Sequence, residues 1–354
     1  MGWFKNLIVY SHSRPQPIRA THNRVLRPVN IAKLPELLRK LSYAFNSRRG
    51  TSDGRTLRTI GGNMRRHIFR VFSLGLFLLF SFAFTDTFAA ETSFNKTTVA
   101  YREIDGHKIL ADVYRPQDEK IRPVIVWIHG GALITGNRDL ENTHFLLVFA
   151  KAKGCAVVSI DYRLAPETKL TEIISDIEEA FRWLAGDGAR QFHLDPRRIV
   201  VTGESAGGYL TLVTGYRVRP KPKALVALYG FGDLIGNWSS KPNPYPRYNL
   251  RKISREEAKS QTDGTVISDS DERKGDGGLI YMYYRQNGLW PEEVSGFARS
   301  TIADKITPFE PIRNVTPDWP PTLLIHGTQD TDVPYEQSDR SLHLDPNRTR
   351  RTFV

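Results

Sequence analysis

Cysteine is nearly absent from this sequence, which has a single one among 354 residues. No disulfide can form within the chain, so the fold has to be stabilised by a non-covalent core. Cys155 lies in the apolar run GCAVVSID, a setting that predicts a buried strand residue and not a reactive thiol.

Acidic residues are scarce in the first 70 positions, which hold 15 Lys and Arg against Glu36 and Asp53. Residues 91–354 carry 35 charges of each sign, so the formal surplus of +12 belongs to the N-terminal end. A nucleic-acid-binding face needs its own basic excess, which excludes that class of partner for the main domain. Residues 1–63 are predicted to be a basic, disordered extension upstream of a start at Met64.

No apolar run is long enough to cross a membrane. The longest, Val71–Phe84, has 14 residues, whereas a span needs about 20. It follows the basic segment 64–70 and precedes the small residues of Thr87–Ala90, which is the order of a cleaved secretory signal. We therefore predict a signal peptide over 64–90 and a secreted or periplasmic protein without a stable membrane span. An uncleaved N-terminal anchor is the alternative.

Short apolar runs, each ending in small or polar residues, follow a predicted hairpin whose Asp105-Gly106 pair suits a turn with positive φ. The runs are 123–129, 155–161, 198–203, 224–230 and 322–327. Such runs are typical of strands buried on both faces, and helical patterns lie between them at 171–186 and 206–217. This alternation predicts one α/β domain over 91–354 with a doubly wound, mostly parallel sheet and functional groups at the strand carboxyl ends.

Residues 231–310 break the alternation, because they contain turn formers and aromatics but no convincing parallel strand. A long excursion between two strands is usually functional. We predict a cap or lid of short helices over the strand ends. A loosely ordered surface insertion is the alternative.

A serine follows one of the apolar runs, in the motif Gly203-Glu-Ser205-Ala-Gly207. The glycines let the chain leave a strand, turn sharply and enter a helix with the hydroxyl at the apex. The predicted strand before the motif and the predicted helix after it make the match meaningful. Ser205 is therefore the candidate nucleophile.

The turn WIHGGA ends an earlier strand in small residues. Stabilising a tetrahedral oxyanion takes backbone N–H donors aimed at one point, and glycines let the main chain approach closely enough. Gly131 and Ala132 are the predicted donors in this turn, and Ala206 is the predicted donor beside the serine. His129 is interpreted as a residue that fixes the turn.

Carboxylates follow the last apolar run in the sequence HGTQDTDVP. A carboxylate at a strand end can orient an imidazole and stabilise its charged form. Asp330 is the predicted acid, with Asp332 as the alternative that would instead cap the following turn. His326 is interpreted as structural.

Four motifs thus stand in order: HGGA at 129–132, DYRLAPE at 161–167, GESAG at 203–207 and HGTQDTDVP at 326–334. Over most of 97–340 the chain resembles the α/β-hydrolase fold, and within it the esterase and lipase group related to hormone-sensitive lipase. The resemblance implies a carboxylic-ester hydrolase with a Ser–Asp–His triad, a cap that selects the acyl group, and no metal or organic cofactor. It also implies that the motif at 161–167 is scaffolding.

The sequence departs from this family at the general base. The histidine should follow Asp330 after one helix and one strand. Elements and connections of ordinary length would take about 26 residues, whereas 24 residues follow Asp330. The tail holds one histidine, His343, within or just after the expected helix, so the C-terminal strand is interpreted as truncated. Three explanations stay open: a chain ended early, His343 as the base on a rearranged tail, or a non-catalytic relative.

These observations predict an exported serine carboxylesterase acting on small to medium acyl esters, with Ser205, Asp330 and His343 as catalytic residues. The expected partner is a small-molecule ester. A serine peptidase of the oligopeptidase type and a binding protein on a hydrolase scaffold are the alternatives.

Overall fold

The domain enters its sheet through a hairpin of β2 (Phe94–Ile104) and β3 (His107–Pro116) in the computed structural model, which describes residues 7–10, 94–142 and 144–343. The predicted turn residues Asp105 and Gly106 have φ values of 50° and 80°, in the left-handed region that a two-residue hairpin turn requires. The strands pair in antiparallel register from Phe94 opposite Pro116 to Ile104 opposite His107.

Five strands form the parallel part of the sheet, and each corresponds to a predicted apolar run. They are β4 (Arg122–Ile128), β5 (Ala156–Ile160), β6 (Leu194–Glu204), β7 (Ala224–Leu228) and β8 (Thr322–Gly327). The sheet order is β1-β8-β7-β6-β4-β5-β3-β2, in which β5, β4, β6, β7 and β8 are all parallel to their neighbours in that group. The chain therefore forms a doubly wound, mostly parallel sheet, as predicted.

The edge beyond β8 is occupied by β1 (Leu7–Tyr10), which pairs with it antiparallel, Leu7 opposite Gly327 and Tyr10 opposite Leu324. The expectation that all of residues 1–63 are disordered is wrong at these four positions. Their sequence, LIVY, is apolar and partly β-branched, which suits an edge strand that completes the hydrogen bonds of β8. Residues 11–63 and the predicted signal at 64–90 lie outside the described residues.

The two faces of the sheet are covered by different helices, because alternate residues of a strand point to opposite sides. Val124, Val126 and Ile128 of β4 lie in one apolar cluster with α4 (Leu170–Ala185) and α6 (Ala206–Arg217). The intervening residues Ile125 and Trp127 lie in a second cluster with α3 (Phe145–Lys153). The helices predicted at 171–186 and 206–217 are confirmed within one residue.

Apolar spacing of 3 and 4 residues explains why α4 packs where it does. Its predicted core face is buried at every position: Ile173, Ile174, Ile177, Ala180, Phe181 and Leu184. Burying a large apolar side chain of this kind contributes roughly 1.5–3 kcal/mol. Cys155 directly precedes β5 and is also buried, and its burial raises the pKa of the thiol, which fits the predicted inert role.

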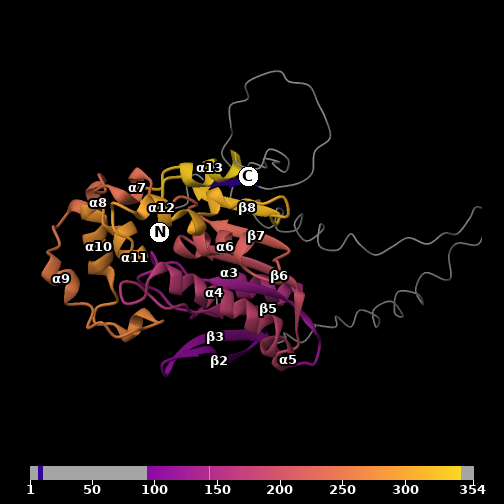
Figure 1. Cartoon of the computed structure of the whole chain (residues 1–354). Helices are drawn as coiled ribbons and strands as arrows, with labels where there is room; N and C mark the ends of the chain where they lie inside the picture. The colour runs from indigo at the N-terminus through magenta and orange to yellow at the C-terminus, as the bar shows by residue number, and fades with distance from the viewer. Residues whose placement is uncertain (1–6, 11–93, 143, 344–354) are drawn as a thin grey trace, which may run out of the picture. The chain divides into compact units, whose positions relative to one another are not determined.

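Residues 231–310 form the predicted cap of short helices, drawn in orange and gathered at one end of the sheet (Figure 1). They are α7 (Asn237–Ser240), α8 (Pro246–Asn249), α9 (Arg255–Lys259), η2 (Ser270–Glu272), α10 (Gly278–Asn287), α11 (Trp290–Ser295), α12 (Ile302–Lys305) and η3 (Thr307–Phe309). The remaining elements are α5 (Asp187–Gln191), η4 (Pro311–Arg313) and α13 (Glu336–His343). Buried residues such as Ile280, Trp290 and Val294 belong to the main apolar cluster, so the cap is packed and not a loose insertion.

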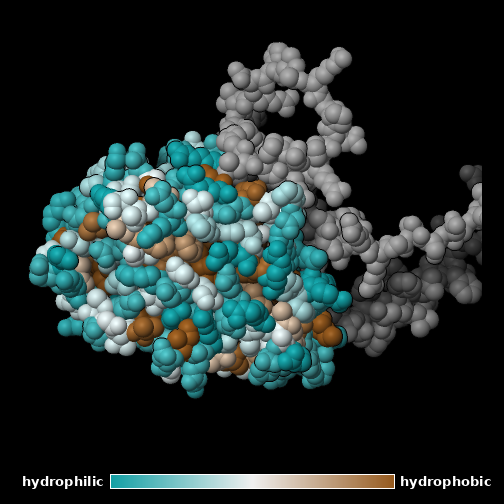
Figure 2. Space-filling model, in the orientation of Figure 1, coloured by the Kyte–Doolittle hydropathy of each residue, from teal (hydrophilic) through white to brown (hydrophobic). Residues whose placement is uncertain are grey.

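The visible face of the molecule is mainly hydrophilic, and its hydrophobic side chains lie in small separate patches (Figure 2). Among the described residues, the helices are all too short or too polar to cross a bilayer.

Candidate active site

Ser205 is the single residue between a strand and a helix, because β6 ends at Glu204 and α6 begins at Ala206. Its φ and ψ of 50° and −117° lie in a region that non-glycine residues rarely adopt. Such a conformation costs on the order of 1–3 kcal/mol and persists only where the surroundings impose it. Here the Ser205 amide donates to the Leu228 carbonyl at 2.9 Å, which ties the apex of the turn to β7.

Glycines allow the serine turn to lie against the end of β4. A Cβ on Gly207 would overlap with the backbone carbonyls of Ile128 and His129, and a Cβ on Gly203 would lie 2.5 Å from the Ile128 oxygen. All of these separations between the added Cβ and a carbonyl oxygen are shorter than real Cβ contacts allow. The motif therefore needs glycine on both sides of Ser205, because two backbone segments meet there.

The turn after β4 lies directly beside the serine, as predicted from the small residues in its sequence. A Cβ on Gly130 would lie 3.4 Å from Ser205 Cβ, which shows how closely the two turns approach. Gly131 and Ala132 have φ values of 96° and 57°. Across the described residues, neither of their amides is engaged in another hydrogen bond. The structure thus brings these two predicted donors together with Ser205 and with Ala206, the first residue of α6.

The His129 ring fixes the conformation of this turn, as predicted. Its ring stacks on Tyr162 with 4.3 Å between centroids and 7° between planes. Nδ1–H donates to the Gly130 carbonyl at 2.9 Å, which leaves Nε2 as a buried lone pair without a partner among the described residues. Burial, only partly offset by the hydrogen bond to Gly130, lowers the pKa of His129 to about 4. The ring is therefore neutral at physiological pH, with Nε2 unprotonated.

The predicted acid, Asp330, is held by the loop that follows β8. Its Oδ1 accepts hydrogen bonds from the amides of Asp332 and Val333 at 2.8 and 3.1 Å, and its Oδ2 lies 3.6 Å from His326 Nε2. Burial alone would raise the pKa of this carboxyl, but the interactions with His326 and the two amides outweigh it, so the pKa lies below its ordinary value. Asp330 is a carboxylate at neutral pH.

Both ring nitrogens of His326 are used within the same loop. Nε2 lies 2.9 Å from the Val333 carbonyl and must donate to it, so Nδ1 accepts from the Ser338 hydroxyl at 2.8 Å. The side chain is buried, with 1% of its surface exposed. His326 therefore stabilises the acid loop, as predicted, and has no free nitrogen to act as a base.

Asp332, the alternative acid, faces the cap and not the serine turn. Its carboxylate accepts from the Tyr281 hydroxyl, and its backbone carbonyl accepts from Arg285 at 2.9 Å. Both of these donors belong to α10. Asp332 joins the loop after β8 to the cap, which leaves Asp330 as the better candidate for the acid.

The histidines whose side chains are described make their polar contacts with groups other than Ser205. Those contacts pair His107 with Ser268, His129 with Gly130, His144 with Leu146, His193 with Glu119, and His326 with Ser338 and Val333. His343 is the last residue of α13, so its backbone lies in the predicted helix, but its side chain is outside the described residues. The structure therefore brings Ser205 and its oxyanion donors together and leaves the predicted base unplaced. Among the described residues, no group of three or more His, Cys, Asp or Glu side chains is arranged to hold a metal ion.

Comparison with known proteins agrees with this geometry. The pattern of a family described as alpha/beta hydrolase fold matches residues 125–262, which include the oxyanion turn and the serine elbow. Two solved structures share the fold: a protein of unknown function from Staphylococcus aureus and an alpha/beta hydrolase superfamily protein from Enterococcus faecalis. The first is 21% identical with a TM-score of 0.54, covering 70% of this chain and 85% of that one. The second is 22% identical with a TM-score of 0.53, covering 72% and 87%. The chain has the α/β-hydrolase fold.

A curated relative of this chain is much longer than the chain itself. The non-reducing polyketide synthase Preu6 of Preussia isomera is 29% identical over 290 residues, which covers 72% of this chain and 13% of that protein. The chain thus spans a small part of that relative's length. The resemblance drawn from the four motifs is confirmed at the level of the α/β-hydrolase fold.

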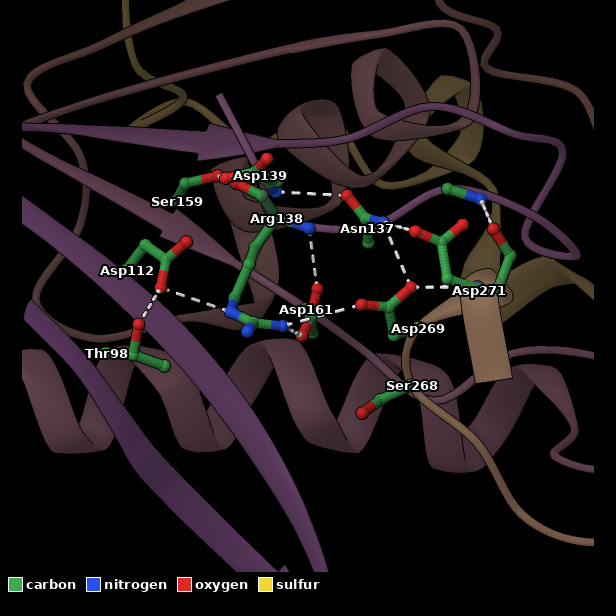
Figure 3. Close-up of polar contacts among 12 residues, drawn as sticks. Thr98, Asp112, Asn137, Arg138, Asp139, Ser159, Asp161, Ser268, Asp269 and Asp271 are labelled. Carbon is green, nitrogen blue, oxygen red and sulfur yellow. Dashed lines mark hydrogen bonds and ion pairs between the residues drawn. The ribbon is translucent and has the colours of Figure 1, made fainter. Parts of the chain in front are cut away.

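The motif at 161–167 is buried scaffolding, as the resemblance implied, and Arg138 is the partner that sequence reasoning missed (Figure 3). Arg138 donates to Asp161 from its backbone amide at 2.7 Å and from its guanidinium at 2.6 Å, and to Asp112 at 3.2 Å. The cap residue Asp269 lies 3.8 Å from the same guanidinium. Despite the pairing with Arg138, burial raises the pKa of Asp161 to about 7, and the charge on Asp269 adds to this.

Three further ion pairs extend the scaffold. Asp176 of α4 accepts from the Arg163 guanidinium at 2.9 Å and from Arg102 at 2.6 Å. Glu167 pairs with Arg273 of the cap, and neither side chain is more than 3% exposed. Arg273 also donates to the backbone carbonyls of Ile134 and Ala165. The scaffold motif thus fastens the cap to the loop that follows the oxyanion turn, a link with no sequence signal because the partners are over 100 positions apart.

Proposed function

We propose that this chain is a serine hydrolase of carboxylic esters with small to medium acyl groups. The observation that carries the proposal is the strained Ser205 elbow lying against a turn whose Gly131 and Ala132 amides have no other partner among the described residues. A hydroxyl in that position can attack a carbonyl carbon while the two amides bind the oxygen that becomes negative.

In the proposed reaction Ser205 Oγ forms a bond to the ester carbonyl carbon and gives its proton to a base. The oxyanion is held by the amides of Gly131, Ala132 and Ala206. Collapse of the tetrahedral intermediate breaks the bond to the alcohol, which leaves with the proton, and water then releases the acid from the acyl-enzyme. Asp330 is the carboxylate that would orient the imidazole of the base. His343 is proposed for that base because it is the histidine that follows Asp330 in the sequence.

We also propose that the protein is exported, since a basic segment, a 14-residue apolar run and small residues precede the domain at 64–90. Esters outside the cytoplasm would then be the substrates, with no metal or organic cofactor required by the chemistry of a serine nucleophile.

The decisive experiment is hydrolysis of p-nitrophenyl acetate and butyrate by the full chain and by Ser205→Ala. We expect at least about a 1,000-fold loss of turnover in the variant, because the attacking oxygen is gone, with an unchanged denaturation midpoint. Ser260→Ala is the matched control, since it removes a hydroxyl from the exposed end of α9 and should keep full activity.

Four results would redirect the proposal. Equal turnover by Ser205→Ala would mean that Ser205 is not the nucleophile. Faster cleavage of peptide amides than of esters would assign a peptidase. A folded wild type without any turnover would favour the binding-protein alternative. Full activity in His343→Gln would assign the base to another group.

A further inference from the structure

The oxyanion turn adopts a conformation that its own sequence does not favour. After Gly131, two successive non-glycine residues, Ala132 and Leu133, have φ values of 57° and 63°. L-residues are strained in this region and remain there only where neighbouring groups hold them. The contacts that fix these two residues therefore determine the direction in which the N–H groups of Gly131 and Ala132 point.

Four successive carbonyls of the turn each accept a hydrogen bond from a different source. Gly131 accepts from the Thr135 amide at 2.8 Å, inside the turn, and Leu133 accepts from the Ala165 amide at 2.8 Å. Ile134 accepts from the Arg273 guanidinium of the cap. The Ala132 carbonyl, between the two strained peptide units, accepts from the indole N–H of Trp290 at 2.9 Å.

Trp290 is well placed to hold this carbonyl firmly. It begins α11 in the cap, and 4% of its surface is exposed. Its ring meets Phe231 edge-on, with 5.7 Å between centroids and 88° between planes, and lies 6.2 Å from Trp238. Phe231 follows β7 and is itself stacked on Tyr209 of α6 at 5.0 Å. The indole is thus linked through Phe231 to the helix that follows Ser205.

We infer that Trp290 is a positioning residue for ester hydrolysis, whose indole N–H holds the Ala132 peptide so that the oxyanion donors stay aligned. This inference rests on the proposed function. Tryptophan is required because phenylalanine fills the same aromatic space without a donor, and the 132–133 peptide would then be free to rotate out of the left-handed region. The cap therefore takes part in the chemical step by fixing backbone geometry, and does not only cover the site.

Trp290→Phe and Trp238→Phe form a matched pair in the full chain. Each removes one indole N–H from the same aromatic cluster, but Trp238 donates to the Asp233 carbonyl at 3.1 Å, away from the oxyanion turn. For Trp290→Phe we expect kcat to fall about tenfold with KM within about twofold, because misaligned donors weaken binding of the transition state and not of the ester. Trp238→Phe should keep the wild-type kcat.

Amide hydrogen exchange of residues 131–136 gives a second readout that does not depend on turnover. Exchange should be faster in Trp290→Phe than in both the wild type and Trp238→Phe. If both variants match in kcat and in exchange, or if Trp290→Phe exchanges faster with an unchanged kcat, the positioning role is wrong. If the wild type shows no Ser205-dependent turnover, the proposed function fails, and the exchange comparison alone decides whether Trp290 holds the turn.

Discussion

The proposed nucleophile half of the site, Ser205 with the turn 129–132, depends mainly on close backbone contacts, whereas the proposed acid half, the loop 327–334, is held by side chains. In the first, the positions of Gly203 and Gly207 leave no room for a Cβ against β4. In the second, the His326 ring and the Asp330 carboxylate replace such contacts with hydrogen bonds. Backbone contacts tolerate almost no substitution, while side-chain contacts can be weakened one at a time. The predictions below test this difference, beginning with the largest effect.

Gly207→Ala should cause the greatest loss, because its Cβ would overlap with two backbone carbonyls that cannot move without displacing β4. We expect a decrease of more than about 4 kcal/mol in the free energy of unfolding, or no soluble protein. Urea unfolding followed by circular dichroism measures it.

Gly264→Ala is the control for this substitution. Gly264 has a φ of 88° and nothing within 4 Å of an added Cβ. The substitution should therefore cost only the strain of holding alanine at a positive φ. That cost should be about 1 kcal/mol. Similar losses for both variants would show that the close approach at Gly207 relaxes easily, and that the nucleophile half is less rigid than its geometry indicates.

Substitution of the two carboxylates in the loop 327–334 should distinguish a role in catalysis from a role in attaching the cap. Asp330→Asn should lower kcat/KM by about 100-fold or more, since an amide cannot stabilise a charged imidazole. Asp332→Asn should change kcat/KM by less than about fivefold, but should destabilise the fold by roughly 1–3 kcal/mol, because the Tyr281 hydroxyl donates to this carboxylate and the Arg285 guanidinium lies 3.5 Å from it. The reverse ranking of the two activities would make Asp332 the acid.

The pH dependence of stability gives a further check on Asp330. Its folded-state pKa is below the ordinary value, so the carboxylate contributes stability above the ordinary pKa. That contribution is lost as pH falls through the lowered pKa. The wild type should therefore exceed Asp330→Asn in unfolding free energy at pH 7, and the difference should shrink on acidification. A difference that grows towards low pH would contradict the assignment.

The same contrast explains what could be predicted from the sequence. Ser205 and its glycines form one continuous motif, and local backbone geometry dictates those residue types, so both the elbow and the strand and helix around it were predictable. The turn at 129–132 was predictable for the same reason. The Trp290 contact with Ala132 was not, because 158 positions separate the two and neither residue type indicates the pairing. Arg138 was missed in the same way.

The sheet edge shows a related restriction. The pairing of β1 with β8 joins segments more than 300 positions apart, and the four apolar residues 7–10 are too few to stand out from a basic surrounding sequence. Strand pairing at an edge depends on which backbone groups the rest of the sheet leaves open. Propensity and periodicity describe single segments, so they predicted the strands of the parallel sheet but not this partner of β8.

The smallest expected effect concerns the buried scaffold around Asp161 and Arg138, and Asp161→Asn tests it. The pKa of Asp161 is raised from 3.8 to about 7 in the folded state, so the folded protein holds this proton more tightly than the unfolded chain. The resulting stability is fully present below about pH 4 and is lost as pH rises through 7. Asparagine carries no charge at any pH, so the energy of its contact with Arg138 does not change with pH. The unfolding free energy of Asp161→Asn should therefore rise relative to the wild type by at least about 1 kcal/mol between pH 5 and 8.

Asp318→Asn supplies the control for that titration, because Asp318 is exposed and pairs with Lys221 in a way that lowers its pKa to about 2. Above pH 5 this carboxyl is ionised in both the folded and the unfolded states, so its difference from the wild type should be flat over the range in which Asp161→Asn changes. Denaturant titrations at pH 5, 6.5 and 8 compare the two variants. A flat profile for Asp161→Asn would mean that Arg138 keeps Asp161 ionised throughout. The scaffold would then be a permanent ion pair, as resistant to pH as the backbone contacts around Gly203 and Gly207.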